Sequence, residues 1–144
     1  MDPLVEVPIE RYPELRDSFK RHWPRAVPGY YAIQSQLVYP QFREACQFAA
    51  YCPYGDIDNG MVAISIKGVF YEVVVQPNSK SVKKIEEAIA TTRRIDWSRE
   101  VCFSFADTEV LQMIRRLKSR LRFDIVMECP AFKHFLSKNS GIIL

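Results

Sequence analysis

The spacing of apolar residues predicts mostly helical structure in the first third of the chain. Three prolines, at positions 3, 8 and 13, keep the first stretch of the chain extended, and a short strand is expected there at residues 4–7. Apolar side chains then recur three or four positions apart over residues 14–23, 30–39 and 41–51. Each of these segments is therefore predicted to be a helix, and a proline ends each of the first two.

The middle of the chain has the pattern of a β-hairpin followed by a helix. Residues 61–67 and 69–75 are rich in β-branched side chains and flank Gly68, which predicts two antiparallel strands. A helix capped by Ser79 or Ser81 should then run to about residue 94, because its apolar side chains return at helical spacing. A third strand is expected shortly afterwards.

That third strand, at residues 101–105, is predicted to be followed by the longest helix and a fourth strand. Asp107 or Thr108 caps the helix, whose apolar residues form one continuous face. The face consists of Val110, Leu111, Ile114, Leu117 and Leu121. Residues 123–127 are predicted as the fourth strand, parallel to the third in a right-handed βαβ unit, and 131–138 as a last short helix.

Together these elements predict a single α/β (α+β) domain over residues 1–144, with a mixed β-sheet of about four to five strands flanked by helices. A chain of 144 residues can bury roughly 70% of the surface that it exposes when unfolded, so the fold needs no disulfide or metal. No apolar run approaches the ~20 residues of a membrane span, and the N-terminus is acidic, unlike a signal peptide. We therefore expect a cytoplasmic or nuclear protein without a membrane partner. Because the chain closes on the apolar residues 141–144, we expect it to be part of a longer protein.

Recognisable catalytic and metal-binding patterns are missing from the sequence. The five glycines have no phosphate-loop spacing, and there is neither a Gly-x-Ser-x-Gly nor a His-Glu-x-x-His segment. We expect His22 and His134 to be structural. The cysteines match no zinc spacing, so we expect reduced and mostly buried thiols. They are Cys46, Cys52, Cys102 and Cys129.

One acidic loop has a partial resemblance to a calcium site. Asp56, Asp58 and Asn59 stand at the spacing of half a calcium-binding loop. Lys67 occupies the position at which such a loop needs a glutamate. We therefore interpret the segment as a turn, for which aspartate, asparagine and glycine are suited.

Basic residues are concentrated on the two predicted helices after the hairpin, and the net charge is +3. Such a surface would attract phosphate groups or an acidic partner. The candidate residues are Lys83, Lys84, Arg93, Arg94, Arg115, Arg116 and Lys118. A solvated helix face explains the same pattern, because Glu86, Glu87 and Glu109 dilute the charge. Aromatic residues that would stack on bases are not interleaved either, so we do not expect a nucleic-acid partner.

A tyrosine-rich region extends across the second and third predicted helices and the loop after them. Most of its side chains should lie in the core, where aromatic rings bury a large area. Those that stay exposed would form a patch for a protein partner. The candidate patch consists of Tyr30, Tyr31, Tyr39, Tyr51 and Tyr54.

Three segments, taken together over most of the chain, resemble the N-terminal half of the glycine N-acyltransferase-like proteins, a branch of the GNAT superfamily. The first is a helix that ends in an aromatic residue and proline at 15–24, before a tyrosine-rich stretch closed by Tyr-Pro-Gln-Phe at 39–42. The second is Ile-Asp-Trp at 95–97, just before a predicted strand. The third is the strand, basic helix and strand over 101–127.

The resemblance implies a GNAT-like N-terminal domain placed before a catalytic GNAT domain, which binds acyl-CoA and transfers the acyl group to an amine. The superfamily's Arg/Gln-x-x-Gly-x-Gly/Ala loop, which binds the cofactor's pyrophosphate at a helix N-terminus, is absent from this sequence. We therefore expect no cofactor and no catalytic residue in this chain, and acyl-CoA as the cofactor of the parent protein. The implied function is a non-catalytic domain that supports or dimerises the catalytic part.

Two other functions stay open. One is a protein–protein interaction module without enzymatic activity, which would use a sheet edge or the aromatic patch to hold its partner. The other is an RNA-associated domain that uses the basic helices, whose affinity would fall steeply with salt. A homodimer is also open, and the sequence identifies neither an acyl donor nor an acceptor.

Overall fold

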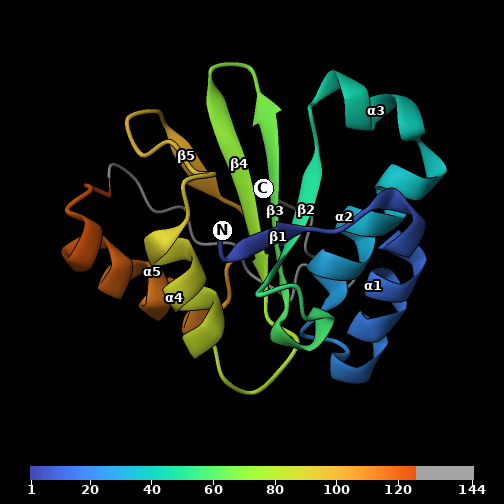
Figure 1. Cartoon of the computed structure of the whole chain (residues 1–144), viewed down its shortest axis with the longest axis horizontal. Helices are drawn as coiled ribbons and strands as arrows, with labels where there is room; N and C mark the ends of the chain where they lie inside the picture. Colours follow the sequence, from blue (N-terminus) through green and yellow to red (C-terminus); the bar gives the residue numbers. More distant parts are fainter. Residues whose placement is uncertain (126–144) are drawn as a thin grey trace, which may run out of the picture.

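Five strands form one mixed sheet that helices cover on both faces (Figure 1). The structure is a computed structural model, and it describes residues 1–125. The strands are β1 (Leu4–Glu6), β2 (Ala49–Pro53), β3 (Met61–Lys67), β4 (Phe70–Gln76) and β5 (Val101–Phe103). The α-helices are α1 (Tyr12–Ser18), α2 (Val27–Val38), α3 (Pro40–Ala45), α4 (Lys83–Thr91) and α5 (Thr108–Leu121). Three short 3-10 helices are η1 (Ile9–Arg11), η2 (Phe19–His22) and η3 (Ile57–Asn59).

The strand order follows the chain, since the sheet runs β1-β2-β3-β4-β5. Neighbours are antiparallel from β1 to β4, and β5 lies parallel to β4. Helix α4 supplies the crossover that a parallel connection requires. These pairings confirm the predicted α/β class, the mixed sheet of four to five strands flanked by helices, and the hairpin around Gly68.

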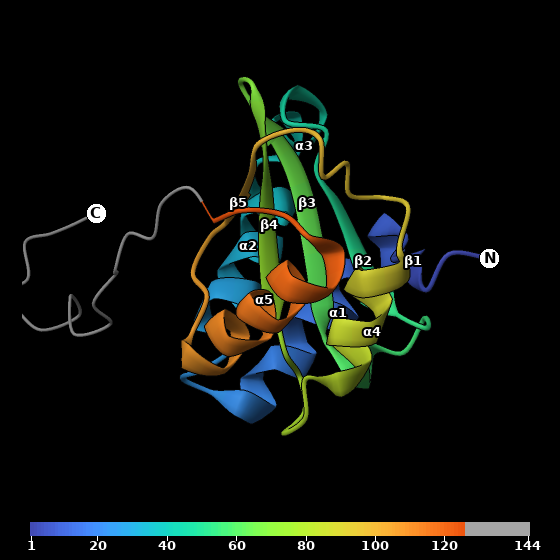
Figure 2. The ribbon, with the colours of Figure 1, turned by 90° about the vertical axis from the view of Figure 1, so that its left-hand side faces the viewer.

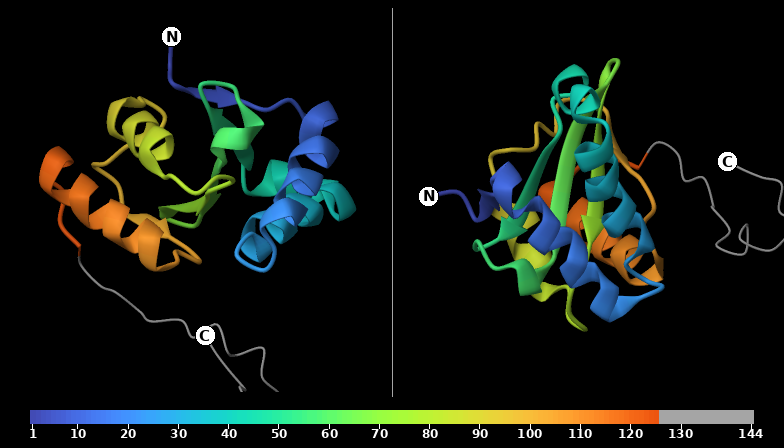
Figure 3. Two further views of the ribbon diagram at one scale, coloured as in Figure 1. Left: turned by 90° about the horizontal axis from the view of Figure 1, so that it is seen from below. Right: turned by 90° about the vertical axis from the view of Figure 1, so that its right-hand side faces the viewer.

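The central strands are buried on both sides, because their side chains alternate between the two faces. Met61 and Ala63 of β3 pack against residues of α1 and α2, whereas Val62 and Ile64 pack against α4 and α5. Figure 2 shows α4 and α5 lying across one face of the sheet, and Figure 3 shows α1 and α2 on the other. Burial of both faces accounts for the nearly continuous apolar run of β3.

Each helical layer encloses its own core. On the side of α1 and α2, the side chains of Tyr12, Leu15 and Phe19 are at most 2% exposed. On the opposite side, α4 and α5 supply the fully buried residues Ile85, Ile89, Met113 and Leu117. The predicted apolar face of α5 is confirmed at Val110, Ile114 and Leu117, while Leu111 and Leu121 are half-buried.

The largest difference from the sequence prediction concerns β2, because residues 41–51 were expected to form one helix. Helix α3 is only six residues long, and Gln47 turns the chain with a left-handed φ of 49°. The following residues then extend between β1 and β3 as a strand. These residues form a strand because they pair with both β1 and β3. The spacing of apolar residues within the segment does not reveal these partners, which are distant in sequence.

Helix boundaries also differ from those expected. The predicted helix at 14–23 ends as an α-helix at Ser18 and continues as η2, and the predicted helix at 30–39 already begins at Val27. Pro28 is compatible with that early start because the first turn of a helix needs no amide hydrogen there. Within residues 1–125, no helix combines the length and the apolar character needed to span a membrane.

The predicted parallel pair lies one element earlier in the chain than expected. It is formed by β4 and β5 around α4, whereas residues 123–125, the described part of the strand expected at 123–127, have no strand structure. The rest of that segment lies outside the described residues, together with the helix expected at 131–138, His134 and Cys129.

The three described cysteines are free thiols in different environments. Cys52 is buried, and burial raises its pKa to about 12, which keeps the thiol protonated and unreactive. Cys46 is half-buried, and Cys102 on β5 is exposed. The expectation of a buried thiol is therefore wrong at Cys102, because β5 is an edge strand among the described residues.

Leu117→Ala should lower the free energy of unfolding by about 2–5 kcal/mol, because it leaves a cavity in the core between α5 and the sheet. Leu121→Ala, at a half-buried position of the same helix, should cost clearly less. Urea unfolding of both variants measures the two losses. Equal losses would contradict the packing of α5 on the sheet described above.

Candidate functional site

The carboxyl ends of the two parallel strands, β4 and β5, form the edge at which an α/β sheet would bind a ligand. β4 and β5 pair over only three residues each, from Tyr71 and Val101 to Val73 and Phe103. Beyond Val73, β4 continues to Gln76 without pairing to β5, and both strands then lead into the N-termini of α4 and α5 (Figure 1). Open α/β sheets bind ligands in the crevice at this kind of edge.

The side chain of Gln76 fills the end of β4. It is 3% exposed, and its Oε1 accepts a hydrogen bond of 3.0 Å from the backbone amide of Gly29 in the first turn of α2. The amides of a first helical turn have no partner inside the helix, and the residue preceding α2 provides no side-chain cap. Gln76 thus caps α2 from another layer of the molecule. A Cβ atom on Gly29 would lie 2.3 Å from Cγ of Gln76, so only glycine fits.

The loop after β4 is fixed from inside by Asn78. This side chain is 3% exposed, and its Nδ2 donates to Ser18 Oγ at 2.8 Å and to the carbonyl oxygen of Ile57 at 3.1 Å. The same loop is packed closely against the residue after η3, since a Cβ on Gly60 would lie 2.6 Å from the carbonyl oxygen of Gln76. Asn78 therefore points into the protein, toward α1 and η3.

An ion-pair bridge joins the N-terminus of α5 to the connection between η2 and α2. Arg25 donates to Asp107 Oδ2 and to Glu109 Oε1, at 2.7 Å each. Burial alone would lower the pKa of Arg25, but the two carboxylates outweigh it and the pKa is raised. Asp107 also caps α5 as predicted, because its Oδ1 accepts a hydrogen bond of 2.9 Å from the amide of Val110. The protein's own side chains thus bridge this edge of the sheet.

Part of the predicted basic surface is neutralised. Arg116 of α5 pairs with Glu86 of α4 at 2.7 Å, and Arg120 pairs with Glu87 at 2.9 Å. These bonds tie the two helices to each other rather than leaving the charges for a ligand. Four of the other candidate cations are exposed on the two helices: Lys83, Lys84, Arg115 and Lys118.

The remaining two basic candidates lie beside the N-terminal strand, and of the two Arg94 contacts it through its guanidinium. Arg94 donates from Nε to the carbonyl oxygen of Leu4 at 2.7 Å, and its guanidinium lies 4.6 Å from the ring centroid of Tyr51. The carboxylate of Asp2 accepts a hydrogen bond of 2.9 Å from the amide of Arg93. The Arg94 side chain, the Arg93 amide and the Tyr51 ring are therefore part of the contact between the N-terminal segment and the residues after α4, while the Arg93 side chain stays exposed.

The five tyrosines of the predicted patch do not form one surface. Tyr30 and Tyr31 contact each other at the start of α2, while Tyr39 contacts Phe42 beyond the end of that helix. Tyr51 lies under a guanidinium, as described above, and Tyr54 borders a separate hollow. The first pair also contacts a residue that the sequence analysis did not select, Trp23, whose indole is 49% exposed. Trp23 is the last residue of the helix predicted at 14–23, and its position beside Pro24 is the signal that it need not be a core residue.

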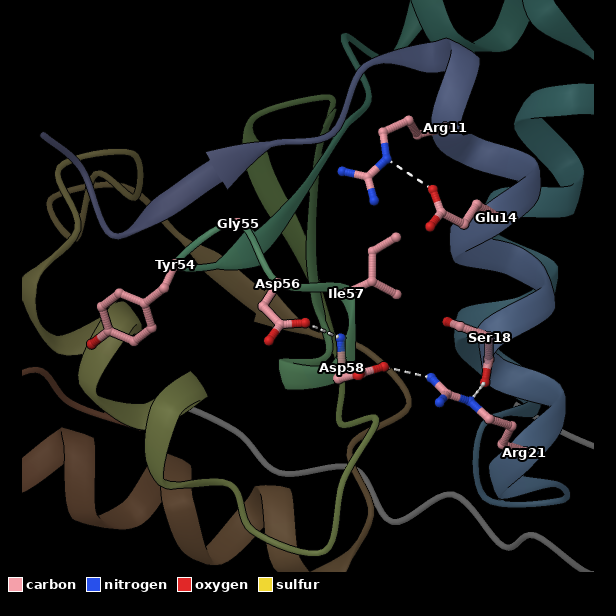
Figure 4. A pocket seen from close by; sticks show the side chains of 9 residues that line it. All are labelled: Arg11, Glu14, Ser18, Arg21, Tyr54, Gly55, Asp56, Ile57 and Asp58. Atoms are coloured by element: carbon pink, nitrogen blue, oxygen red, sulfur yellow. Dashed lines mark hydrogen bonds and ion pairs between the residues drawn. The ribbon is translucent and has the colours of Figure 1, made fainter.

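The hollow beside Tyr54 lies between α1 and η3 and has a volume of about 500 Å³ (Figure 4). Four of its charged side chains form two ion pairs, because Arg11 contacts Glu14 at 2.8 Å and Arg21 contacts Asp58 at 2.7 Å. The hydroxyl of Ser18 already donates to a backbone carbonyl at 2.6 Å and has no activating base among these contacts. The hollow therefore offers no activated nucleophile.

The acidic loop at the rim of this hollow is a turn, as predicted. Asp56 accepts a hydrogen bond of 2.9 Å from the amide of Asp58 and so caps η3. Gly60 follows with a φ of 106°, a conformation that favours glycine. In the described part of the chain, no group of three or more histidine, cysteine, aspartate or glutamate side chains is arranged to hold a metal ion.

Comparisons with known proteins give a structural likeness but no family. No protein-family model and no curated protein matches the sequence. A solved structure that resembles this one is the crystal structure of a Drosophila protein determined by the Northeast Structural Genomics Consortium. It superposes with a TM-score of 0.68 at 14% sequence identity, over 83% of this chain and 45% of the Drosophila chain. At that identity the likeness shows the fold alone, and this chain spans less than half the length of the Drosophila protein.

Gly29→Ala should destabilise the protein by about 1–3 kcal/mol, because the new methyl group collides with the buried side chain of Gln76. The direction is informative, since the same change in an unhindered helix would stabilise it by roughly 1 kcal/mol. Ser35→Ala, at an exposed position of α2, is the matched control and should change stability by less than about 0.5 kcal/mol. Chemical denaturation measures both. A stabilising Gly29→Ala would refute the close approach of α2 to β4.

The carboxylate of Asp2 should make stability depend on pH. Burial alone would raise its pKa, but hydrogen bonds from the amides of Arg93 and Leu4 and from the Thr92 hydroxyl outweigh it, and Arg94 adds attraction. The pKa therefore lies below 3.8 in the folded state. A carboxyl group with a lowered pKa stabilises the fold above its unfolded pKa and loses this contribution as the pH falls through the folded value.

Asp2→Asn should therefore cost about 1 kcal/mol near neutral pH, because charge-assisted hydrogen bonds are weakened while the shape is kept. The difference from the parent chain should shrink as the pH falls below 3.8. Thermal unfolding of both proteins across this range measures it. A difference that stays constant with pH would mean that the charge of Asp2 does not contribute.

Proposed function

We propose that this chain is a non-catalytic, GNAT-like domain of an acyl-CoA-dependent N-acyltransferase-like protein, in which it supports or dimerises the catalytic part. The proposal starts from the three segments that resemble the glycine N-acyltransferase-like proteins. It is supported by the five-stranded mixed sheet with helices on both faces, which agrees with the architecture expected of that resemblance.

The observation that carries the non-catalytic part is the state of the sheet edge at the ends of β4 and β5. Binding the pyrophosphate of CoA at a helix N-terminus needs backbone amides that approach the anion closely, for which glycine is suited. The loop between β4 and α4 contains no glycine over residues 77–82. Its Asn78 is turned inward, and Gln76 fills the space beside it with a bond to α2.

The bridge between Arg25 and the start of α5 supports the same conclusion. In this bridge the guanidinium of Arg25 is bound to the carboxylates of Asp107 and Glu109, and the contact joins α5 to the connection before α2. A group that is tied in this way is not free to act as an acid, a base or an anion-binding residue. We therefore place acyl-CoA binding and amine acylation in another part of the parent protein.

A second candidate function is a protein interaction module without an enzymatic partner domain. Exposed apolar side chains at and after the end of α2 favour it, because Val38, Tyr39 and Phe42 are each about half exposed, at 51%, 49% and 52%. An RNA-associated role is less well supported, because two arginines of the basic helices are paired with glutamates.

Isothermal titration of the purified chain with acetyl-CoA and with a longer acyl-CoA, at moderate salt, tests the proposal. We expect no saturable binding of either ligand. Circular dichroism of the same sample, with cooperative thermal unfolding, is the control that the protein is folded. Saturable binding would overturn the non-catalytic assignment, because the contacts of Gln76 and Arg25 at the ends of β4 and β5 would then have to break for the cofactor.

A further inference from the structure

Three aromatic rings form a corner at the entrance to α2. Trp23, Tyr30 and Tyr31 contact one another with ring centroids 5.4 Å, 6.3 Å and 5.0 Å apart. The angles between the ring planes are 86°, 60° and 76°, so the rings stand at steep angles to one another instead of stacking. A hollow of about 260 Å³ is lined by these three residues and Lys20. We call the three residues Trp23, Tyr30 and Tyr31 the aromatic corner.

The aromatic corner is open to solvent. The side chain of Trp23 is 49% exposed and that of Tyr31 is 54% exposed, while Tyr30 is half-buried. Aromatic rings gain stability mainly by burial, so an exposed group of three is an unusual use of apolar surface in a small protein. Packing of the fold does not explain it, because the core below α2 is closed by Ile33 and Phe19, which are fully buried.

A cation already lies against the aromatic corner. Nζ of Lys20 is 5.9 Å from the ring centroid of Tyr30, within the range of a cation–π contact. The same ammonium is 3.6 Å from Asp17, and both side chains are exposed, so Lys20 is held only weakly. The negative faces of the rings thus attract a positive group, and the one in contact with the Tyr30 ring is the exposed ammonium of Lys20.

The surroundings do not repel a further cation. The neighbouring arginines are paired with carboxylates, Arg21 with Asp58 and Arg25 with two acidic side chains of the α5 N-terminus. Asp17 is shared, because it contacts Arg16 at 2.9 Å and Lys20 at 3.6 Å, so each of these four cations has an acidic partner.

We propose that the aromatic corner is a binding site for a methylated ammonium group, such as the trimethylammonium of choline or of a trimethylated lysine side chain. A primary ammonium is strongly hydrated, and the cost of removing its water limits binding to exposed rings. A trimethylammonium group carries the same charge behind methyl groups, so it gains both cation–π attraction and apolar contact from the three rings. The ligand then displaces the ammonium of Lys20 from its weak contact with the Tyr30 ring.

The test uses the full chain with Trp97→Phe, which leaves Trp23 as the single tryptophan, because the sequence has two. Phenylalanine keeps a ring in the stack of Trp97 with Phe123, whose centroids are 4.8 Å apart. The fluorescence of Trp23 is followed during titration with choline chloride at constant ionic strength. A parallel titration uses 3,3-dimethylbutan-1-ol, the uncharged analogue of choline with carbon in place of nitrogen. We expect saturable binding of choline and at least about fivefold weaker binding of the alcohol.

Variants of three residues separate a cation site from a merely apolar surface. Tyr31→Ala should abolish choline binding, and Tyr31→Phe should retain it. Lys20→Met should tighten choline binding by about two- to fivefold, because the resident ammonium is gone. Tyr39→Ala is the matched control, since Tyr39 is equally exposed at 49% but lies outside the aromatic corner, and it should leave binding unchanged.

A peptide carrying one trimethyllysine, compared with its unmodified form, distinguishes the two sources of the group. Tighter binding of the methylated peptide than of choline would assign the site to a protein partner, and the reverse would assign it to a small molecule. Equal binding of choline and the uncharged alcohol would overturn the proposal, as would the absence of saturation. Weaker choline binding by Lys20→Met would overturn it as well, because Lys20 would then help to form the site instead of occupying the place of the ligand.

Discussion

The structure depends on one constraint, namely that β3 and β4 are buried on both faces. An apolar strand pair of this kind is stable only when a helical layer lies on each side of the sheet. The chain meets this requirement with α1 and α2 on one face and with α4 and α5 on the other. The sheet separates these two helical layers. Direct contacts between them are therefore made at the edge of the sheet, beyond the ends of β4 and β5.

The rim at the carboxyl ends of β4 and β5 shows how this is achieved. Gln76 joins the end of β4 to α2, and Arg25 joins the connection before α2 to the start of α5. Both contacts use polar groups that would otherwise be available to a ligand in the crevice of an open α/β sheet. The contacts that hold the two layers together thus also occupy the edge at which open α/β sheets bind ligands.

Patterns that are local in sequence predicted the fold best. The hairpin of β3 and β4, the apolar face of α5 and the Asp107 cap each depend on neighbouring residues, and all three were anticipated. Strand β2 was missed because its identity comes from β1 and β3, which pair with it across the sheet. The parallel pair was expected one element too late, since spacing along a chain does not specify which strands become neighbours in space.

The candidate sites were predictable only in part, for a related reason. The sequence showed where basic residues and tyrosines are concentrated, but not that Arg116 would contact Glu86 or that Arg94 would lie over Tyr51. The corner of Trp23, Tyr30 and Tyr31 depends on the turn between η2 and α2, which brings the last residue of the helix predicted at 14–23 against the first turns of α2.

The span of the Arg25 bridge has a consequence for the way the molecule folds. Its two ends, Arg25 and Asp107, are 82 positions apart in the chain. Contacts between distant residues form against a larger loss of chain entropy than those of a hairpin. We therefore expect the pairing of β3 with β4 to form early on the folding route and the Arg25 bridge to form late. During synthesis on the ribosome, Arg25 can meet Asp107 and Glu109 only after the start of α5 has emerged.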